Sequence, residues 1–312
     1  MKKAVIFGGS GFIGGHIVCR LVAKGYHVYV VTRSKDKAAR LKLLGNLGQV
    51  EIVESDLSDI KLIEKLVSGC DAVVNLVGTI NEMREAALRY LHVAVPYNLA
   101  KLASKYGKKY VHFSAMGIEL ATRSPYAKTK LEGEQKVQSM CKDAIIVRPN
   151  LVFGDEDNFF HKFARLATVS PFLFTIGKGD KLLQPVYVGD LADVTVDLIE
   201  NCSDLEGICE ICGPKTYSSH ALMRFVLDAT LRKKIIIKVP HFLAKVIAVF
   251  CEFKIISFLL KPLTGSSEPV ITRNQLELLK HDIVASGLYK IYNTSTEMET
   301  IMTEHLKMYA KS

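Results

Sequence analysis

Gly8-Gly9-Ser10-Gly11-Phe12-Ile13-Gly14 is the stretch that decides the fold. It follows the apolar run 4–7 and precedes the run 17–24, in which apolar residues recur at helical spacing. This order predicts a buried strand, a glycine-rich turn and a helix. The first turn of a helix has unpaired amide groups and carries roughly half a positive charge. The glycine-rich turn that leads into it is therefore predicted to bind a pyrophosphate.

The glycines of this turn have separate predicted tasks. Gly8 permits the tight turn, Gly11 lets a ligand approach the backbone, and Gly14 lets the helix pack against the strand. Their G-x-x-G-x-x-G spacing resembles the extended and atypical short-chain dehydrogenase/reductase superfamily, whose members often carry G-G-x-G-F-(I/L)-G here. We predict that the nucleotide contacts six residues of the turn: Gly8, Ser10, Gly11, Phe12, Ile13 and Gly14.

Composition limits the classes of partner. The net charge is +9, from 41 Lys and Arg against 32 Asp and Glu, which favours an anionic partner such as a phosphorylated cofactor, an acidic protein surface or anionic lipid. No Lys/Arg block is interleaved with aromatic residues, so nucleic acid is not a predicted partner. The seven cysteines are scattered, which predicts free thiols in a reducing compartment and no metal site.

The start of the chain shows no signal-peptide pattern, because the apolar run is short and glycines follow it. We therefore expect a cytoplasmic or already processed protein, with peripheral association at the inner membrane as a further expectation.

Six short apolar runs alternate with helical runs in the first half of the chain. The pattern predicts an α/β fold with a doubly wound, parallel Rossmann sheet. We expect residues 1–150 to form a domain that binds NAD(P), and residues 151–312 to form a smaller α+β lobe that binds substrate or a partner and interleaves with the first. The predicted strands are 4–7, 27–32, 50–54, 72–77, 110–114 and 144–148.

Ligands of such sheets bind beyond the carboxyl ends of the strands. Six residues of different segments fall at or just after a predicted strand end: Gly8, Arg33, Asp56, Gly78, Ser114 and Asn150. We expect them to meet at one edge of the sheet, together with their neighbours Leu57, Val77 and Pro149, and to form the nucleotide site.

Arg33 favours NADP(H) over NAD(H). It follows the second predicted strand, where an acidic residue would bind the 2′-hydroxyl of NAD and an arginine accommodates the 2′-phosphate of NADP. The alternative is that Arg33 stacks on adenine and NAD(H) binds as well. The superfamily resemblance places Asp56 beside the adenine amino group, and the alternative for Asp56 is a carboxylate that caps a turn.

Tyr126 and Lys130 have the Y-x-x-x-K spacing that puts two side chains on one face of a helix. A neighbouring ammonium favours phenolate, so we expect a lowered pKa for Tyr126 and a role as general acid/base. Ser114 ends the fifth predicted strand. This set resembles the catalytic triad of the short-chain dehydrogenases. That resemblance implies that Lys130 holds the nicotinamide ribose, Tyr126 shuttles the proton and Ser114 orients the substrate during hydride transfer.

The segment 239–260 is long and apolar but contains Lys245, Glu252 and Lys254. Charges of this kind argue against a membrane span. We expect an amphipathic helix whose residues Leu243, Val246, Ile247 and Phe250 face the core. The alternative is a docking surface for a membrane or a partner protein.

A narrower resemblance covers most of the chain. It rests on the ordered segments 148–154, 157–160, 184–192, 210–214 and 271–276. They resemble the atypical short-chain dehydrogenase group that includes the nucleotide-binding accessory subunit of respiratory complex I and its bacterial homologues. The resemblance implies tightly held NADPH and a structural or assembly role. The alternatives are an NADP-dependent oxidoreductase of unknown substrate and an epimerase or dehydratase of nucleotide-sugars.

Overall fold

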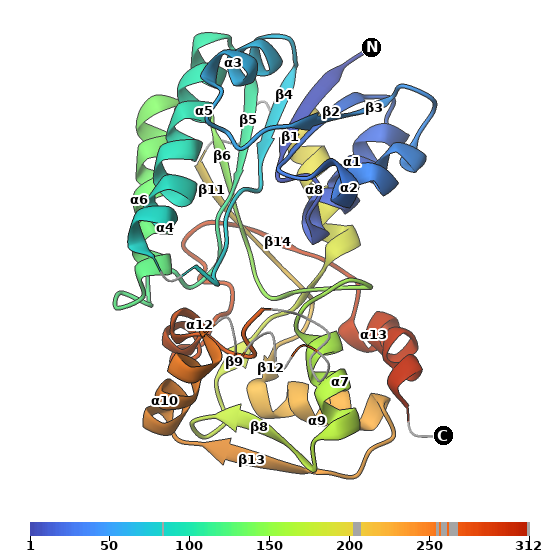
Figure 1. The fold of residues 1–312 in the computed structure, drawn as a ribbon, viewed down its shortest axis with the longest axis vertical. Helices are drawn as coiled ribbons and strands as arrows, with labels where there is room; N and C mark the ends of the chain where they lie inside the picture. The colour runs from blue at the N-terminus through green and yellow to red at the C-terminus, as the bar shows by residue number, and fades with distance from the viewer. Residues whose placement is uncertain (83, 202–206, 254–255, 257–260, 262–267, 311–312) are drawn as a thin grey trace.

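The computed structural model describes residues 1–312 except 83, 202–206, 254–255, 257–260, 262–267 and 311–312. Its main feature is an eight-stranded sheet in which every paired neighbour is parallel (Figure 1). In spatial order the strands are β14 (Lys290–Asn293), β11 (Gly207–Cys212), β6 (Ile145–Pro149), β5 (Lys109–Phe113), β4 (Ala72–Asn75), β1 (Lys3–Phe7), β2 (His27–Thr32) and β3 (Val50–Glu54).

Helices cover both faces of this sheet. One face packs against α1 (Phe12–Ala23) and α8 (Val188–Glu200), with α2 (Lys35–Ala38) and the 3₁₀ turn η1 (Ala39–Leu44) nearby. The other face packs against α3 (Ile60–Ser68), α5 (Val95–Lys105) and α6 (Pro125–Met140). This arrangement confirms the predicted doubly wound α/β fold.

The strand order reverses at β1. From β1 the chain proceeds to β2 and β3 on one side, and β4, β5 and β6 follow on the other. Such a reversal is where open parallel sheets bind ligands, because the loops from the two neighbouring strands diverge and leave a crevice. The glycine turn leaves β1 at this point.

The lower part of the molecule in Figure 1 packs around a separate apolar cluster. The helices of this lower part are α7 (Phe160–Val169), α9 (Ser219–Ala229), α10 (His241–Cys251), α12 (Arg273–Leu278), α13 (Met298–Leu306) and the 3₁₀ turn η3 (Lys307–Tyr309). Its strands form three two-stranded ladders: β8 (Phe172–Ile176) with β13 (Ile235–Val239), β7 (Val152–Phe153) with β10 (Val186–Tyr187), and β9 (Leu182–Leu183) with β12 (Tyr217–Ser218).

The helical stretch before β5 is interrupted. It consists of α4 (Glu85–Arg89), a π-helical turn η2 (Tyr90–Ala94) and α5, with Pro96 in the first turn of α5. A proline lacks the amide proton that would continue the helix, so the preceding turn widens.

Helix α10 has the opposite orientation to the one expected for a core-facing amphipathic helix. Its buried residues are the small side chains Ala244, Ala248 and Cys251, and the side chain of Glu252 is turned inward to pair with Arg273 at 2.8 Å. Seven large apolar residues are exposed: Phe242, Leu243, Val246, Ile247, Val249, Phe250 and Phe253. They include all four residues that were expected to face the core. The expectation was therefore wrong, because α10 packs inward through its small residues, with Glu252 beside them paired to α12.

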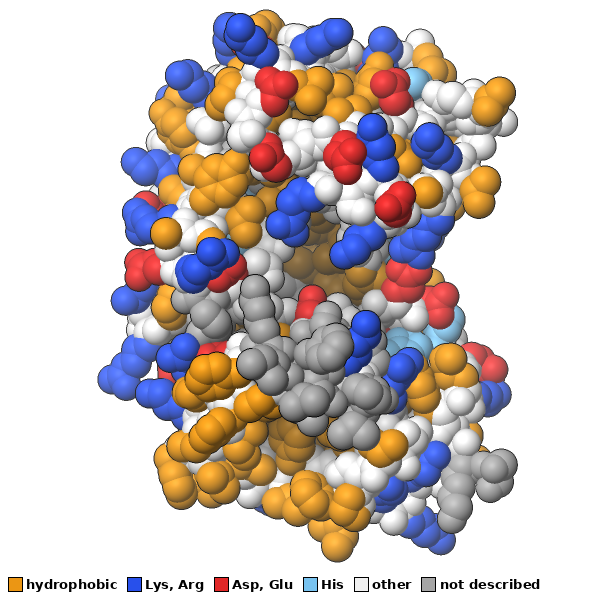
Figure 2. All heavy atoms as spheres, in the orientation of Figure 1, with side chains coloured by type: hydrophobic (Ala, Val, Ile, Leu, Met, Phe, Trp, Pro, Cys, Tyr) orange, Lys and Arg blue, Asp and Glu red, His pale blue; other side chains and the backbone are white. Residues whose placement is uncertain are grey.

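We call these seven exposed residues the α10 patch. In Figure 2, hydrophobic side chains gather over α10 and β13 at the lower edge of the molecule. None of the helices in the described part of the chain is long and apolar enough to cross a bilayer.

A buried ion pair holds α6 against the sheet. Arg148 on β6 donates to both carboxylate oxygens of Glu134 on α6, at 2.9 and 2.6 Å. Both residues are almost fully buried, and the Tyr289 ring lies 4.8 Å from the guanidinium. A bidentate pair of this kind restricts both the position and the rotation of the helix.

Candidate functional site

The glycine turn brings backbone atoms unusually close together. Gly8 has φ +81°, and a Cβ there would lie 3.2 Å from the carbonyl carbon of Leu76, after β4. A Cβ on Gly14 would lie 2.6 Å from the Cα of Gly9. The N-cap of α1 is Gly11, which has no side chain to cap the helix. The first-turn amides are therefore available to an anion at the reversal of the sheet.

Two further residues of the turn, Phe12 and Ile13, point in different directions. The Phe12 ring packs edge-on against His16, with ring centroids 5.8 Å apart. The side chain of Ile13 packs against the apolar core beneath the sheet. Only their backbone amides are thus available to a phosphate.

The end of β2 lies next to the glycine turn. Ser10 and Thr32 share a hydrogen bond of 2.9 Å between their hydroxyl oxygens. Arg33 follows Thr32 and is exposed. Neither its side chain nor that of Lys37 makes an ion pair with a described residue, whereas Lys35 lies 3.8 Å from Glu54. Two unpaired cations therefore follow β2 at the position predicted for the adenosine ribose.

Asp56 forms a local turn after β3. Its Oδ1 accepts hydrogen bonds from the amide of Ser58 at 2.9 Å and the hydroxyl of Ser58 at 2.5 Å, and these bonds lower the pKa of the carboxyl. The next residue, Leu57, has φ +72°, which is rare for a side chain of this kind. The turn-capping alternative is thus present in the structure. The second carboxylate oxygen makes no hydrogen bond to a described residue.

Val77 and Gly78 follow β4, and the amide of Val77 donates to Oδ1 of Asn75 at 3.0 Å. A Cβ on Gly78 would lie 3.1 Å from Nζ of Lys130 and 3.3 Å from Nε2 of His92. This loop therefore borders both the glycine turn and α6.

Ser114, Tyr126 and Lys130 are all buried, and Lys130 borders this loop. Nζ of Lys130 donates to the carbonyl of Phe113 at 2.8 Å, directly before Ser114. Oγ of Ser114 has no hydrogen-bond partner among the described residues. A buried hydroxyl without a hydrogen-bond partner lowers the stability of the fold, so this orphan oxygen of Ser114 is a candidate contact for a polar atom of a ligand.

The expected lowering of the Tyr126 pKa was wrong. Burial is the larger effect and raises the pKa of Tyr126, and the negative charge of Glu134 raises it further. Burial also lowers the pKa of Lys130 to about 8, against a smaller opposing effect of Glu134. In this geometry Tyr126 is a proton donor at neutral pH, and Lys130 is only moderately biased toward its charged form.

The side chain of Asn150 is engaged with the protein itself. Its Nδ2 donates to the carbonyl of Ile283 at 2.7 Å, and its Oδ1 accepts from the amides of Leu151 and Gln184. Asn150 therefore fastens the end of β6 to the second half of the chain. Pro149 ends β6, and its carbonyl accepts from the amide of Met116.

Three residues that the sequence patterns did not single out help to build this site. Asn274 on α12 accepts from Oγ of Ser124 at 2.9 Å and donates to the carbonyl of Ile80 at 3.2 Å. His92 and Thr129 are joined at 2.9 Å beside Tyr126. Asn274 lies 150 residues from Ser124 in the chain, so no local pattern could have revealed the contact.

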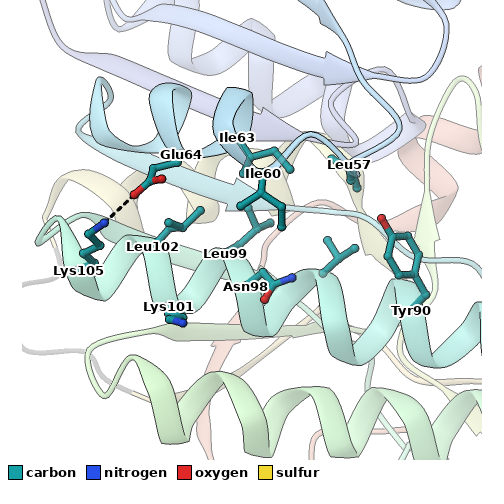
Figure 3. Close-up of a pocket in the computed structure, with 11 residues that line it drawn as sticks. Leu57, Ile60, Ile63, Glu64, Tyr90, Asn98, Leu99, Lys101, Leu102 and Lys105 are labelled. Carbon is teal, nitrogen blue, oxygen red and sulfur yellow. Dashed lines mark hydrogen bonds and ion pairs between the residues drawn. The ribbon is translucent and has the colours of Figure 1, made fainter.

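A hollow separates the upper and lower parts of the molecule in Figure 2, and basic side chains lie along its upper edge. A second hollow of about 310 Å³ lies between α3 and α5 (Figure 3). It is mostly apolar, with the Glu64–Lys105 ion pair at one end and Leu57 near the other. Leu57 is the only predicted nucleotide contact among its lining residues, so this second hollow is separate from the triad.

The profile of the NAD dependent epimerase/dehydratase family matches residues 4–212. The chain belongs to this family. The match includes the glycine turn, all six strand ends and the triad. Nicotinamide dinucleotide is the cofactor class of the family, and the bare amides of the glycine turn and the orphan Ser114 hydroxyl fit such a ligand.

Within the NAD dependent epimerase/dehydratase family, the chain has relatives among complex I subunits. It is 30% identical over 228 residues to NADH dehydrogenase (ubiquinone) 1 alpha subcomplex subunit 9 of Dictyostelium discoideum, covering 73% of this chain and 64% of the relative. The Arabidopsis thaliana subunit 9 is 28% identical, covering 91% of this chain and 71% of the relative. The chain thus spans about two thirds of the length of these relatives.

Solved structures share the fold of this family member. UDP-glucose 4-epimerase of Thermotoga maritima, solved with UDP-glucose, matches with a TM-score of 0.65 at 19% identity, over 76% of this chain and 85% of the other. The Thermus thermophilus UDP-glucose 4-epimerase, solved with NAD, matches with a TM-score of 0.58 at 20% identity, over 76% and 86%.

Gly14→Ala is expected to damage both the fold and nucleotide binding. The new Cβ would overlap the backbone of the turn, so we expect a loss of about 1–3 kcal/mol in the free energy of unfolding and dinucleotide affinity at least about tenfold weaker. Thermal unfolding and nucleotide titration measure the two effects. Gly15→Ala is the matched control, because its Cβ would meet only a Leu41 methyl at 3.6 Å. Equal behaviour of the two variants would contradict the assignment.

Proposed function

We propose that this protein is an NADP(H)-holding accessory subunit of a complex I-type NADH:ubiquinone oxidoreductase, attached peripherally at the membrane side of that assembly. The observation that carries the proposal is the exposed α10 patch on a dinucleotide-binding fold. Subunit 9 proteins of complex I are relatives at 28–30% identity, which supports the choice of assembly. In this proposal residues 1–150 hold the nucleotide and residues 151–312 carry the docking surface.

The proposed nucleotide site runs along the strand ends. The pyrophosphate lies against Gly8, Ser10, Gly11, Phe12, Ile13 and Gly14, with adenine near Asp56 and Leu57, the 2′-phosphate at Arg33, and the nicotinamide half near Val77, Gly78, Pro149 and Asn150. Support for NADP(H) comes from the unpaired cations after β2, since a guanidinium binds a phosphate bidentately.

The proposed occupant of the α10 patch is an anionic membrane surface. A contiguous exposed apolar face of this kind is unusual on a protein without a partner. Lys238 and Lys245 lie exposed beside the patch, and neither makes an ion pair with a described residue. Apolar residues flanked by lysines suit the boundary between acyl chains and negatively charged headgroups.

The triad gives the proposal a chemical alternative, an active NADP-dependent oxidoreductase. When bound, the nucleotide supplies or accepts the hydride. Tyr126 would donate a proton to the substrate oxygen, Lys130 would hold the ribose, and Ser114 would bind the same oxygen through its orphan hydroxyl. The same residues would serve an epimerase of nucleotide-sugars.

Arg33→Ala is expected to weaken NADPH binding by about 10- to 100-fold, the loss of one charge-assisted contact. NADH binding should change less than about twofold, because NADH has no 2′-phosphate. Titration of both nucleotides by fluorescence measures the difference. Lys42→Ala, on the neighbouring turn η1, is the control for loss of charge. An equal loss for NADPH and NADH would favour adenine stacking over phosphate recognition.

Charge introduced into the α10 patch should release the protein from membranes. We expect Val246→Glu/Phe250→Glu to move from the membrane fraction to the supernatant and to lose binding to vesicles that contain anionic lipid, since both side chains are exposed. Leu288→Glu, at an exposed apolar residue outside the patch, is the control. Retention of the double variant on isolated complex I, with vesicle binding lost, would identify a protein partner instead of lipid.

Tyr126→Phe distinguishes an accessory subunit from an active oxidoreductase. An accessory subunit should keep its NADPH affinity within about twofold and should still assemble, because the phenol oxygen makes no hydrogen bond to a described residue and its removal costs little. Complementation of a strain that lacks the protein, followed by fractionation of the assembled complex, measures this. Loss of function with NADPH still bound would favour the enzyme.

A further inference from the structure

His92 lies on the π-helical turn η2, between α4 and α5, and is completely buried. Its imidazole lies between the loop after β4 and helix α6. Nε2 faces the amide of Thr79, in the loop after β4, at 3.2 Å. Nδ1 faces Oγ1 of Thr129, on α6, at 2.9 Å. A single side chain therefore joins the loop that carries Gly78 to the helix that carries Tyr126.

The hydrogen bonds define where the proton of this imidazole resides. The amide of Thr79 can only donate, so Nε2 must be the acceptor and the proton must lie on Nδ1. Nδ1 then donates to Thr129, whose hydroxyl lies within hydrogen-bond distance of the carbonyls of Pro125 at 2.9 Å and Tyr126 at 3.0 Å. The result is a directed chain from the β4 loop to the first turn of α6.

The imidazole also touches the triad. Its ring lies edge-on to the Tyr126 ring, with centroids 5.3 Å apart and an interplanar angle of 87°. Gly78 lies beside both His92 and Lys130, because a Cβ there would come within 3.3 Å of Nε2 and 3.1 Å of Nζ. A shift of the imidazole would therefore disturb both the loop of Gly78 and the ring of Tyr126.

We propose that His92 is a positioning residue of the nucleotide site: as a neutral imidazole with its proton on Nδ1, it locks the Gly78–Thr79 loop to α6 and so fixes the wall against the nicotinamide ribose. This inference rests on the nucleotide-binding function proposed above. His92 acts through Thr79, Thr129 and Tyr126 and does not itself contact the reacting atoms.

Two features of the surroundings keep His92 in this state. Burial, and then the positive charge of Lys130, lower the pKa of His92 to about 3, so a second cation does not form beside Lys130 at physiological pH. The backbone is fixed as well. A Cβ on Gly133 would lie 1.8 Å from the carbonyl oxygen of His92, so the π turn rests directly on the backbone of α6.

The test uses the full-length protein and two ligands. NADPH contains both halves of the dinucleotide, whereas 2′-phospho-ADP-ribose lacks the nicotinamide. We expect His92→Leu to bind NADPH about tenfold more weakly and to lose the enhanced fluorescence of bound nicotinamide. Binding of 2′-phospho-ADP-ribose should change less than about twofold, because the adenosine half contacts other loops.

Conservative variants separate a positioning role from a packing role. His92→Gln places an oxygen near the position of Nε2 and should recover most of the NADPH affinity. His92→Asn is too short to reach Thr79 and should behave like His92→Leu. Should His92→Leu fail to fold, Thr129→Val is a second test, because it removes the hydrogen bond between Nδ1 of His92 and the Thr129 hydroxyl. We expect this variant to show the same selective loss of NADPH affinity.

A spectroscopic measurement tests the proton position in the wild-type protein without any ligand. Long-range ¹H–¹⁵N spectra of the imidazole should show the Nδ1–H tautomer with no titration between about pH 5 and 8. An Nε2–H tautomer, a titrating His92, or equal NADPH affinity in the wild type and a folded His92→Leu would overturn the inference while leaving the nucleotide function intact. Failure of the wild-type protein to bind either ligand would refute the nucleotide function, and this inference with it.

Discussion

The close approach of backbone to backbone around the glycine turn is the constraint on which the rest of the structure depends. Gly8 lies against the chain that leaves β4, and Gly14 lies against Gly9 within the same turn. These contacts aim the first turn of α1 at the point where the strand order reverses. If either contact lengthened by the width of a methyl group, the helix would move and its amides would no longer converge there.

The parts of the fold that follow from local patterns could be predicted from the sequence. β1, β4, β5 and β6 are almost entirely buried and lie in short, mostly apolar runs, and the i, i+4 spacing of Tyr126 and Lys130 needs only one helix. The outer strand β14 could not be predicted in this way. It is short and partly exposed, and it joins the sheet through β11, far away in the sequence.

The failed expectations share a physical cause, because contacts with other elements outweighed a local pattern. Helix α10 packs inward through its small residues Ala244, Ala248 and Cys251, and its large apolar side chains face solvent. The pKa of Tyr126 rises because burial by the surrounding chain exceeds the effect of its neighbour Lys130. Sequence spacing contains no information about burial or about which residues of other elements a side chain will contact.

The ion pair at the end of α10 also connects this helix to the triad. Glu252 binds both the amide and the side chain of Arg273, and the next residue, Asn274, holds the N-cap Ser124 of the helix that carries Tyr126. This helix is anchored at its N-terminus by α12 and along its length by Arg148 and Glu134. Burial raises the pKa of Tyr126, so the anchored helix holds a protonated phenol in a fixed position. Hydride transfer would also require a substrate oxygen to reach the orphan hydroxyl of Ser114.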